Sequence, residues 1–264
     1  MTEETTPKND AYDARFSDIL GGEEYDDLLI ALEFYDEFQT QTGLALKKYL
    51  ETNCQNLPII KVLEAGPGTG ITTFELLKTD PRVKVVSVDN EPKMLSAVEN
   101  RFAQVKDLKD RVDFVLADIL KFIEDSPDNS FDAFASVYTL HNFTPDFRRK
   151  VIEVISKKLK PGAIFINGDK YSRENPDHQN DIAAEIKNYD KFDIAAAKAE
   201  AEGNLERAAH LRKIKGEWIA HTHEDDKNQI TVEEQENMLR ELGFTDIQWG
   251  KRYDLVTTVT AIKK

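Results

Sequence analysis

The stretch Val62-Leu63-Glu64-Ala65-Gly66-Pro67-Gly68-Thr69-Gly70, VLEAGPGTG, joins an apolar run to an amphipathic segment. The preceding residues, NLPII, are typical of a buried strand, and the following residues, ITTFELLK, are typical of a helix. Glycine is favoured wherever a tight strand-to-helix turn requires positive φ. The stretch therefore predicts a glycine-rich turn between a strand and a helix, and its ligand decides the function.

The spacing of the glycines argues against a phosphate ligand. Gly66, Gly68 and Gly70 alternate, whereas the dinucleotide fingerprint G-x-G-x-x-G needs its third glycine at position 71, which is Ile71. The nucleoside-triphosphate loop needs Gly-Lys-Ser/Thr, and the turn contains no lysine. Glu64 stands at the mouth of the turn, where a carboxylate would repel a pyrophosphate but attract an ammonium group.

Strand-like runs alternate with amphipathic helical segments, which predicts βαβ crossovers and a mainly parallel sheet. The strand-like runs are IIKVLEA, VKVVSVD, VDFVLAD, FDAFASVY and AIFING, and two further ones, FTDIQWG and DLVTTVTAI, end the sequence. Lys160-Pro161-Gly162 predicts a stop between a helix and its strand. Thr231 and Glu234 have capping-box spacing and predict the start of the last helix.

The pattern divides the chain into three parts, and the third contains an insertion. Residues 1–10 are polar and predict a disordered tail. Residues 11–56 predict an N-terminal helical cap, and residues 57–264 predict the main domain. The alternation breaks at 173–215, which predicts a helical insertion that serves, with the cap, as a lid over the site.

Composition restricts the class of partner. Among 264 residues, 35 Lys and Arg stand against 49 Asp and Glu, a formal net charge of −14, so we expect no nucleic-acid partner and favour small molecules. Cys54 is the single cysteine, which excludes an intrachain disulfide and favours a reducing compartment. No apolar run is long enough for a membrane span and the N-terminus is acidic, so we expect a cytoplasmic protein without membrane association; the oligomeric state stays undetermined.

Acidic residues end the next two predicted strands. Asp89 follows VKVVSV, at a position where a carboxylate can bind both hydroxyls of a ribose, and Asp118 follows VDFVLA. Together with Glu64 these residues would face one crevice at the carboxyl edge of the sheet. Three carboxylates in that arrangement suit a nucleoside that carries positive charge.

The segments VLEAGPGTG, VVSVDNEPKML, VLADIL, FDAFASVYTLHNF and LKPGAIFI, in this order, resemble a class I S-adenosylmethionine-dependent methyltransferase, over roughly residues 58–170. The resemblance implies an α/β fold, a Rossmann-like three-layer sandwich with a seven-stranded, mostly parallel sheet and an antiparallel last strand. It implies an enzyme that uses S-adenosyl-L-methionine. The YTLHN segment resembles small-molecule methyltransferases, and no Asn-Pro-Pro-Tyr type sequence, typical of planar-nitrogen acceptors, follows the fourth strand.

The resemblance also implies roles for individual residues. Glu64 and the backbone of the glycine turn would line the methionine moiety, and Asp89 would bind the ribose hydroxyls. Asp118 would accept a hydrogen bond from the adenine amino group. Ser136 or Tyr138 would present backbone to the amino group of the cofactor. The full set of implied cofactor-binding residues is Glu64, Gly66, Gly68, Gly70, Asp89, Asn90, Met94, Asp118, Ile119 and Ser136.

Two residues are candidates for the chemistry of transfer. His141 follows the fourth strand and is either a general base or a residue that caps the next helix. Tyr171, after Asp169 and Lys170 at the end of the fifth strand, either contacts the acceptor or packs at the hinge of the insertion. The sequence around His221 and His223, which continues with three acids, suggests metal ligands, but neighbours on an extended loop point apart and we expect no metal.

Three alternatives to a small-molecule methyltransferase stay open. One is a protein that binds the cofactor without catalysis and serves as a regulator or scaffold. A second is an NAD-type oxidoreductase, which Glu64 and the glycine spacing disfavour. The third is carboxymethyl chemistry with the same cofactor, which would need an arginine near the sulfonium that the sequence does not identify.

Overall fold

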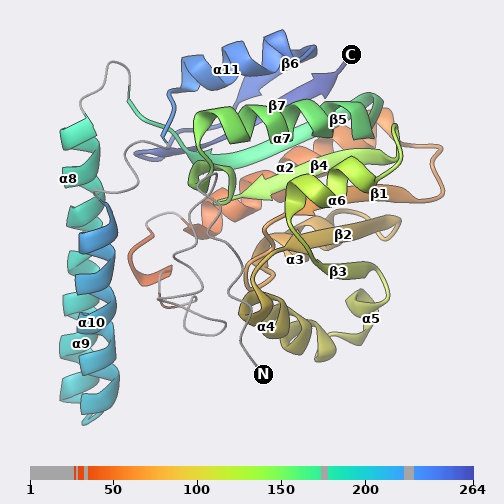
Figure 1. The fold of residues 1–264 in the computed structure, drawn as a ribbon. Coiled ribbons are helices and arrows are strands. Elements are labelled where there is room, and N and C mark those ends of the chain that lie inside the picture. Colours follow the sequence, from red (N-terminus) through yellow and green to blue (C-terminus); the bar gives the residue numbers. More distant parts are fainter. Residues whose placement is uncertain (1–26, 28, 33–34, 174–177, 223–228) are drawn as a thin grey trace, which may run out of the picture.

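The computed structural model describes residues 27, 29–32, 35–173, 178–222 and 229–264. Figure 1 shows a central twisted sheet with helices on both faces and a separate group of helices to one side. The strands are β1 (Ile60–Ala65), β2 (Val83–Asp89), β3 (Val112–Leu116), β4 (Phe131–Val137), β5 (Leu159–Lys170), β6 (Phe244–Trp249) and β7 (Val256–Lys263). The helices are α2 (Tyr35–Asn53), α3 (Ile71–Thr79), α4 (Pro92–Ala103), α5 (Lys106–Lys109), α6 (Ile119–Asp125), η2 (Leu140–Asn142), α7 (Pro145–Lys158), α8 (His178–Asn188), α9 (Asp190–Ala201), α10 (Leu205–Thr222) and α11 (Val232–Glu241).

The sheet has the order β3-β2-β1-β4-β5-β7-β6. Strands β1 to β5 pair in parallel, whereas β7 is antiparallel to both β5 and β6. The predicted Rossmann-like sandwich with an antiparallel last strand is confirmed. The order reverses between β1 and β4, so the crevice at the carboxyl ends of these two strands is where such sheets bind ligands.

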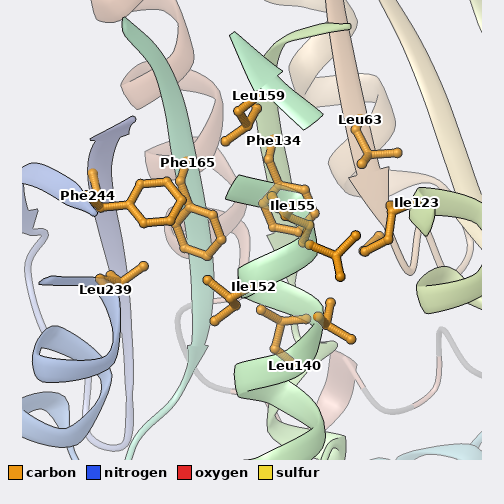
Figure 2. Packing of buried hydrophobic residues seen from close by; sticks show 14 of the residues in the cluster. Leu63, Ile123, Phe134, Leu140, Ile152, Ile155, Leu159, Phe165, Leu239 and Phe244 are labelled. Carbon is orange, nitrogen blue, oxygen red and sulfur yellow. The ribbon is translucent and has the colours of Figure 1, made fainter. Parts of the chain in front are cut away.

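Two hydrophobic clusters hold the layers together. On one face, α2, α3 and α4 bury side chains such as Leu46, Leu76 and Phe102 against alternate residues of the central strands. On the other face, α6, α7 and α11 pack on the intervening residues. Figure 2 shows Phe134 of β4 and Phe165 of β5 beside α7, and their rings stack with centroids 5.0 Å apart.

The Lys160-Pro161-Gly162 segment does not separate α7 from its strand. Strand β5 already begins at Leu159, where it pairs with Phe131, and the pairing resumes at Ile164 with Ala133. The Pro-Gly segment is therefore an irregularity within the strand, and Gly162 takes a φ of +81° there.

The N-terminal helix α2 packs on one face of the sheet, and the inserted helices follow the carboxyl end of β5. In the predicted cap, 11–56, the structure shows one α-helix, α2 (Tyr35–Asn53), and residues 27 and 29–32 are not α-helical. The other residues before 35, including the predicted tail 1–10, lie outside the described residues. Helices α8, α9 and α10 pack around Phe192, Leu211 and Trp218 in a cluster that Ala31 joins. Helix α10 continues to Thr222, beyond the expected end at 215, because Ile214 and Trp218 belong to that cluster. None of the described helices is both long enough and apolar enough to cross a bilayer.

Candidate active site

The glycine turn after β1 has the backbone geometry that only glycine adopts readily. Gly66, Gly68 and Gly70 have φ values of +67°, +54° and +89°. A Cβ atom on Gly66 would lie 2.3 Å from Oγ1 of Thr139, in the loop after β4, and one on Gly70 would lie 2.4 Å from Val98 of α4. The turn is therefore clamped between the β4 loop and α4, and it exposes backbone rather than side chains to a ligand.

Glu64 is fully buried beneath this turn and is only partly satisfied. Its Oε2 accepts hydrogen bonds from Oγ1 of Thr73, at 2.7 Å, and from the hydroxyl of Ser87. Its Oε1 has no hydrogen-bond partner among the described residues. Burial raises the pKa of Glu64 to about 7, although the two hydroxyls lower it. A cationic ligand group at Oε1 would satisfy this oxygen and favour the ionised carboxylate.

Asp89 ends β2 beside the turn. Its Oδ1 accepts the backbone N–H of Glu91 at 2.9 Å. Burial raises the pKa of Asp89 to about 6, against the lowering by backbone N–H groups of Glu91, Gly68 and Asn90. The side chain is thus held at the carboxyl end of its strand and ionised at neutral pH, as required of an acceptor for ribose hydroxyls.

The remaining residues implied for the cofactor lie around the same edge. Asp118 caps α6, where its Oδ1 accepts the N–H of Lys121 at 2.9 Å. Ile119 is buried in the core on that side, Met94 is buried on α4, and Asn90 is exposed after β2. Ser136 of β4 is fully buried, and its Oγ has no partner within the described part of the chain.

His141 and Asp169 form a buried pair at the ends of β4 and β5. Nδ1 of His141 lies 2.6 Å from Oδ1 of Asp169, and both side chains are almost completely buried. Burial lowers the pKa of His141, although Asp169 opposes it. Burial raises the pKa of Asp169, but His141 and Arg148 outweigh it and the net direction is down. An ionised carboxylate only accepts hydrogen bonds, so Nδ1 is the donor and Nε2 carries the lone pair of the neutral ring.

Neighbouring residues fix the segment that carries His141. Arg148 is fully buried on α7, and its Nε donates to the carbonyl oxygen of Leu140 at 3.0 Å. Tyr138 has a φ of +52°, and its ring packs edge-on to His141 with centroids 6.1 Å apart. On its other side Tyr138 stacks on Tyr35 and meets Phe38, so α2 covers this end of the strands.

The structure brings His141 together with Asp169 but places Tyr171 in the hydrophobic core. Tyr171 is fully buried, packs edge-on to Trp249 of β6, and receives a 2.8 Å hydrogen bond from Nδ2 of Asn167. Burial raises the pKa of Tyr171 far above its ordinary value. This environment favours the packing interpretation over contact with an acceptor. Within the residues that the structure describes there is no group of three or more potential metal ligands, and His223 to Asp226 lie outside them.

Residues 62–162 match a protein-family model described as a methyltransferase domain. The matched segment is a methyltransferase domain. The matched residues run from the glycine turn to the start of β5 and make up less than half of the chain. They contain Glu64, Asp89, Asp118 and His141, whereas Asp169 lies just beyond them.

Curated relatives match parts of the methyltransferase domain. The chain is 29% identical over 137 residues to the reducing polyketide synthase Preu2 of Preussia isomera, across 51% of this chain and 6% of that protein. It is 27% identical over 143 residues to a release factor glutamine methyltransferase of Koribacter versatilis, across 45% of this chain and 49% of that protein. The chain thus spans half or less of the length of these relatives.

Solved structures share the fold. The CurJ carbon methyltransferase is 17% identical and superposes with a TM-score of 0.58, over 85% of this chain and 54% of that one. The magnesium protoporphyrin IX methyltransferase ChlM from Synechocystis PCC 6803, solved with bound SAM, is 13% identical with a TM-score of 0.58, over 97% of this chain and all of that one. Both likenesses concern the fold of the methyltransferase domain with its flanking helices.

Proposed function

We propose that this chain is an enzyme that transfers the methyl group of S-adenosylmethionine to a small-molecule acceptor, and that the acceptor loses a proton to His141. The observation that carries the proposal is the buried His141–Asp169 pair, with Nδ1 and Oδ1 separated by 2.6 Å. A neutral histidine oriented by a carboxylate is an arrangement suited to general-base catalysis. The pair lies at the ends of β4 and β5, beside the strand that carries the glycine turn.

The residues of the turn and the strand ends fit the cofactor. Glu64 Oε1, which lacks a partner in the described structure, would receive the ammonium group of the methionine moiety. Gly66 and Gly68 would pass close beneath that moiety, Asp89 would hold the ribose hydroxyls, and Asp118 would face the adenine. When bound, S-adenosylmethionine supplies an electrophilic methyl group on a sulfonium sulfur. The protein's contribution is to bind and orient it and to exclude water.

His141 would act on the acceptor. Its Nε2 takes the proton of an O–H group or an acidic C–H group as the acceptor attacks, and Asp169 stabilises the imidazolium that results. Arg148 holds the carbonyl of Leu140 and so fixes the loop on which His141 is placed. General-base assistance of this kind contributes about 10²- to 10⁴-fold in rate.

Three observations support a small acceptor over a macromolecule. The net charge of −14 disfavours nucleic acid. The structures that share the fold include carbon methyltransferases and proteins described as O-methyltransferases, whose acceptors would need to lose a proton. The YTLHN segment after β4 also lacks the Asn-Pro-Pro-Tyr pattern.

The test is a transfer assay that separates binding from chemistry. Calorimetry should show that S-adenosylmethionine binds the wild type and His141→Ala with similar affinity, whereas NAD does not bind. Release of S-adenosylhomocysteine should then be measured across phenols, β-ketoacyl thioesters and amines. We expect turnover with the first two classes and a loss of about 10²-fold or more in His141→Ala. Cofactor binding without turnover of any acceptor would instead support the scaffold alternative.

A further inference from the structure

A buried carboxylate from the insertion pairs with Lys170, the residue that follows Asp169 at the end of β5. Glu185 of α8 is 7% exposed. Its Oε1 accepts a hydrogen bond from Nζ of Lys170, at the end of β5, and a second from the hydroxyl of Tyr189 at 2.9 Å. Tyr189 in turn is 3.2 Å from Oγ1 of Thr222 on α10. The carboxylate is therefore anchored to the sheet on one side and to the helical insertion on the other.

Lys170 connects Glu185 to the pair directly. The backbone N–H of Lys170 donates to Oδ1 of Asp169 at 3.1 Å, on the same oxygen that His141 contacts. Burial raises the pKa of Glu185, but Lys170, Tyr189 and His141 together lower it below its ordinary value. Glu185 is thus an ionised carboxylate paired with the Lys170 ammonium.

The second oxygen of Glu185 has no partner in the described part of the chain. Oε2 is buried and forms no hydrogen bond with any described residue. Buried polar atoms almost always form hydrogen bonds. Leaving a buried charged oxygen without a hydrogen bond costs more free energy than leaving a neutral one. Because Lys170 already balances the charge of Glu185, the missing partner needs a donor hydrogen but no positive charge.

We propose that Oε2 of Glu185 accepts a hydrogen bond from a second hydroxyl or N–H group of the methyl acceptor, and that the helical insertion thereby selects acceptors beside His141. The proposal rests on the proposed methyltransferase function, since it assigns the acceptor a place next to the base. It predicts that the acceptor carries a neutral donor group in addition to the site that is methylated.

Glu185→Gln is the direct test because it replaces one acceptor oxygen of the carboxylate with an NH₂ group, which donates. The amide oxygen of the glutamine would face the Lys170 ammonium, so its NH₂ group would occupy the place of Oε2 and oppose another donor. Tyr189→Phe is the matched control for docking of the insertion, since it removes a partner of Oε1 and leaves Oε2 unchanged. Glu200→Gln controls for loss of an exposed ion pair within the insertion, that with Arg212.

Binding is measured on protein saturated with S-adenosylhomocysteine, so that no turnover is needed. The probes are phenol, catechol and 2-aminophenol, titrated by ligand-observed NMR. We expect the wild type, Tyr189→Phe and Glu200→Gln to bind catechol and 2-aminophenol about 10-fold more tightly than phenol, and Glu185→Gln to reduce this preference to about 3-fold or less. S-adenosylhomocysteine affinity should be equal in all four proteins.

The contrary outcomes are distinct. A wild type that shows no preference, a preference that survives in Glu185→Gln, or an equal loss in Tyr189→Phe each overturns the assignment to Oε2. His141→Ala should keep the preference, because Glu185 rather than the base recognises the second donor. Failure of the transfer assay with an intact, Glu185-dependent preference would refute the proposed function and leave the binding site standing.

Discussion

Replacing Asp169 with asparagine tests how the buried pair works. Asp169→Asn keeps the volume of the side chain but removes the charge that orients His141 and stabilises its imidazolium. The 2.6 Å contact is almost fully buried, and hydrogen bonds to charged groups contribute about 1.5–3 kcal/mol. Since about 1.4 kcal/mol corresponds to a factor of ten, we expect kcat/KM to fall by about 10- to 150-fold, with cofactor affinity unchanged.

The rate of methyl transfer in Asp169→Asn should also change in its dependence on pH. His141 acts as a base only when neutral, so the rate should rise with pH through its pKa, which burial places below 6.5. Asp169 is the group that raises this pKa, while Lys170 and Arg148 lower it further and Glu185 lies nearby. In Asp169→Asn the rising limb should therefore move to lower pH while the plateau falls.

The assay is the release of S-adenosylhomocysteine over pH 5–9 at saturating cofactor. Asp190→Asn is the matched control, because Asp190 is an exposed partner of Lys215 on the insertion. An unchanged plateau in Asp169→Asn, or a limb that moves to higher pH, would refute the assignment of a neutral base held by a carboxylate.

Three further predictions concern the cofactor site. The pKa of Glu64 is raised from 4.5 to about 7, so the stability that Glu64 contributes is present below pH 4.5 and lost as the pH rises through 7. Glu64→Gln should therefore raise the free energy of unfolding of the free protein by up to about 3 kcal/mol at pH 8 and by little at pH 5, as measured in urea titrations. The same variant should weaken cofactor binding. In calorimetry, Asp89→Ala should weaken cofactor binding by about 1.5–3 kcal/mol per lost hydrogen bond. Asp113→Ala, at an exposed position, should bind the cofactor as the wild type does. Equal cofactor affinity in Asp89→Ala and the wild type would contradict the ribose assignment. Gly66→Ala should lower the free energy of unfolding more than Gly162→Ala. Positive φ costs either alanine about 1–2 kcal/mol, but only the Cβ at position 66 would clash, at 2.3 Å from Oγ1 of Thr139. Equal losses in the two variants would contradict the clamped turn.

The sequence predicts the fold well because its signals are local and periodic. Alternating apolar residues fix the strands, glycines at positive φ fix the turn, and Thr231 forms the expected capping box with Glu234. The Pro-Gly segment at 160–162 predicts a break before β5, but the strand already includes it, with a register shift between Phe131 and Ala133.

The site could be predicted only in part because its pairs join distant residues. Asp169 and His141 are each visible in the sequence as polar residues after apolar strands, and strands that become neighbours in the sheet bring them together. The position of Asp169 at the end of β5 did not by itself indicate how close its carboxylate lies to His141. Glu185 gave no signal at all, because an acid on an amphipathic helix is usually solvated, and only the packing of α8 beside Lys170 buries it.

The tautomer of His141 tests most directly whether this residue is the general base. The chain has five histidines, so ¹⁵N spectra of the labelled wild type and of His141→Gln assign the ring nitrogens of His141 by difference. At pH 7.5 we predict a neutral ring with the proton on Nδ1, in a hydrogen bond to Asp169, and a lone pair on Nε2. A ring protonated on Nε2, whether neutral or cationic, would contradict its role as the base.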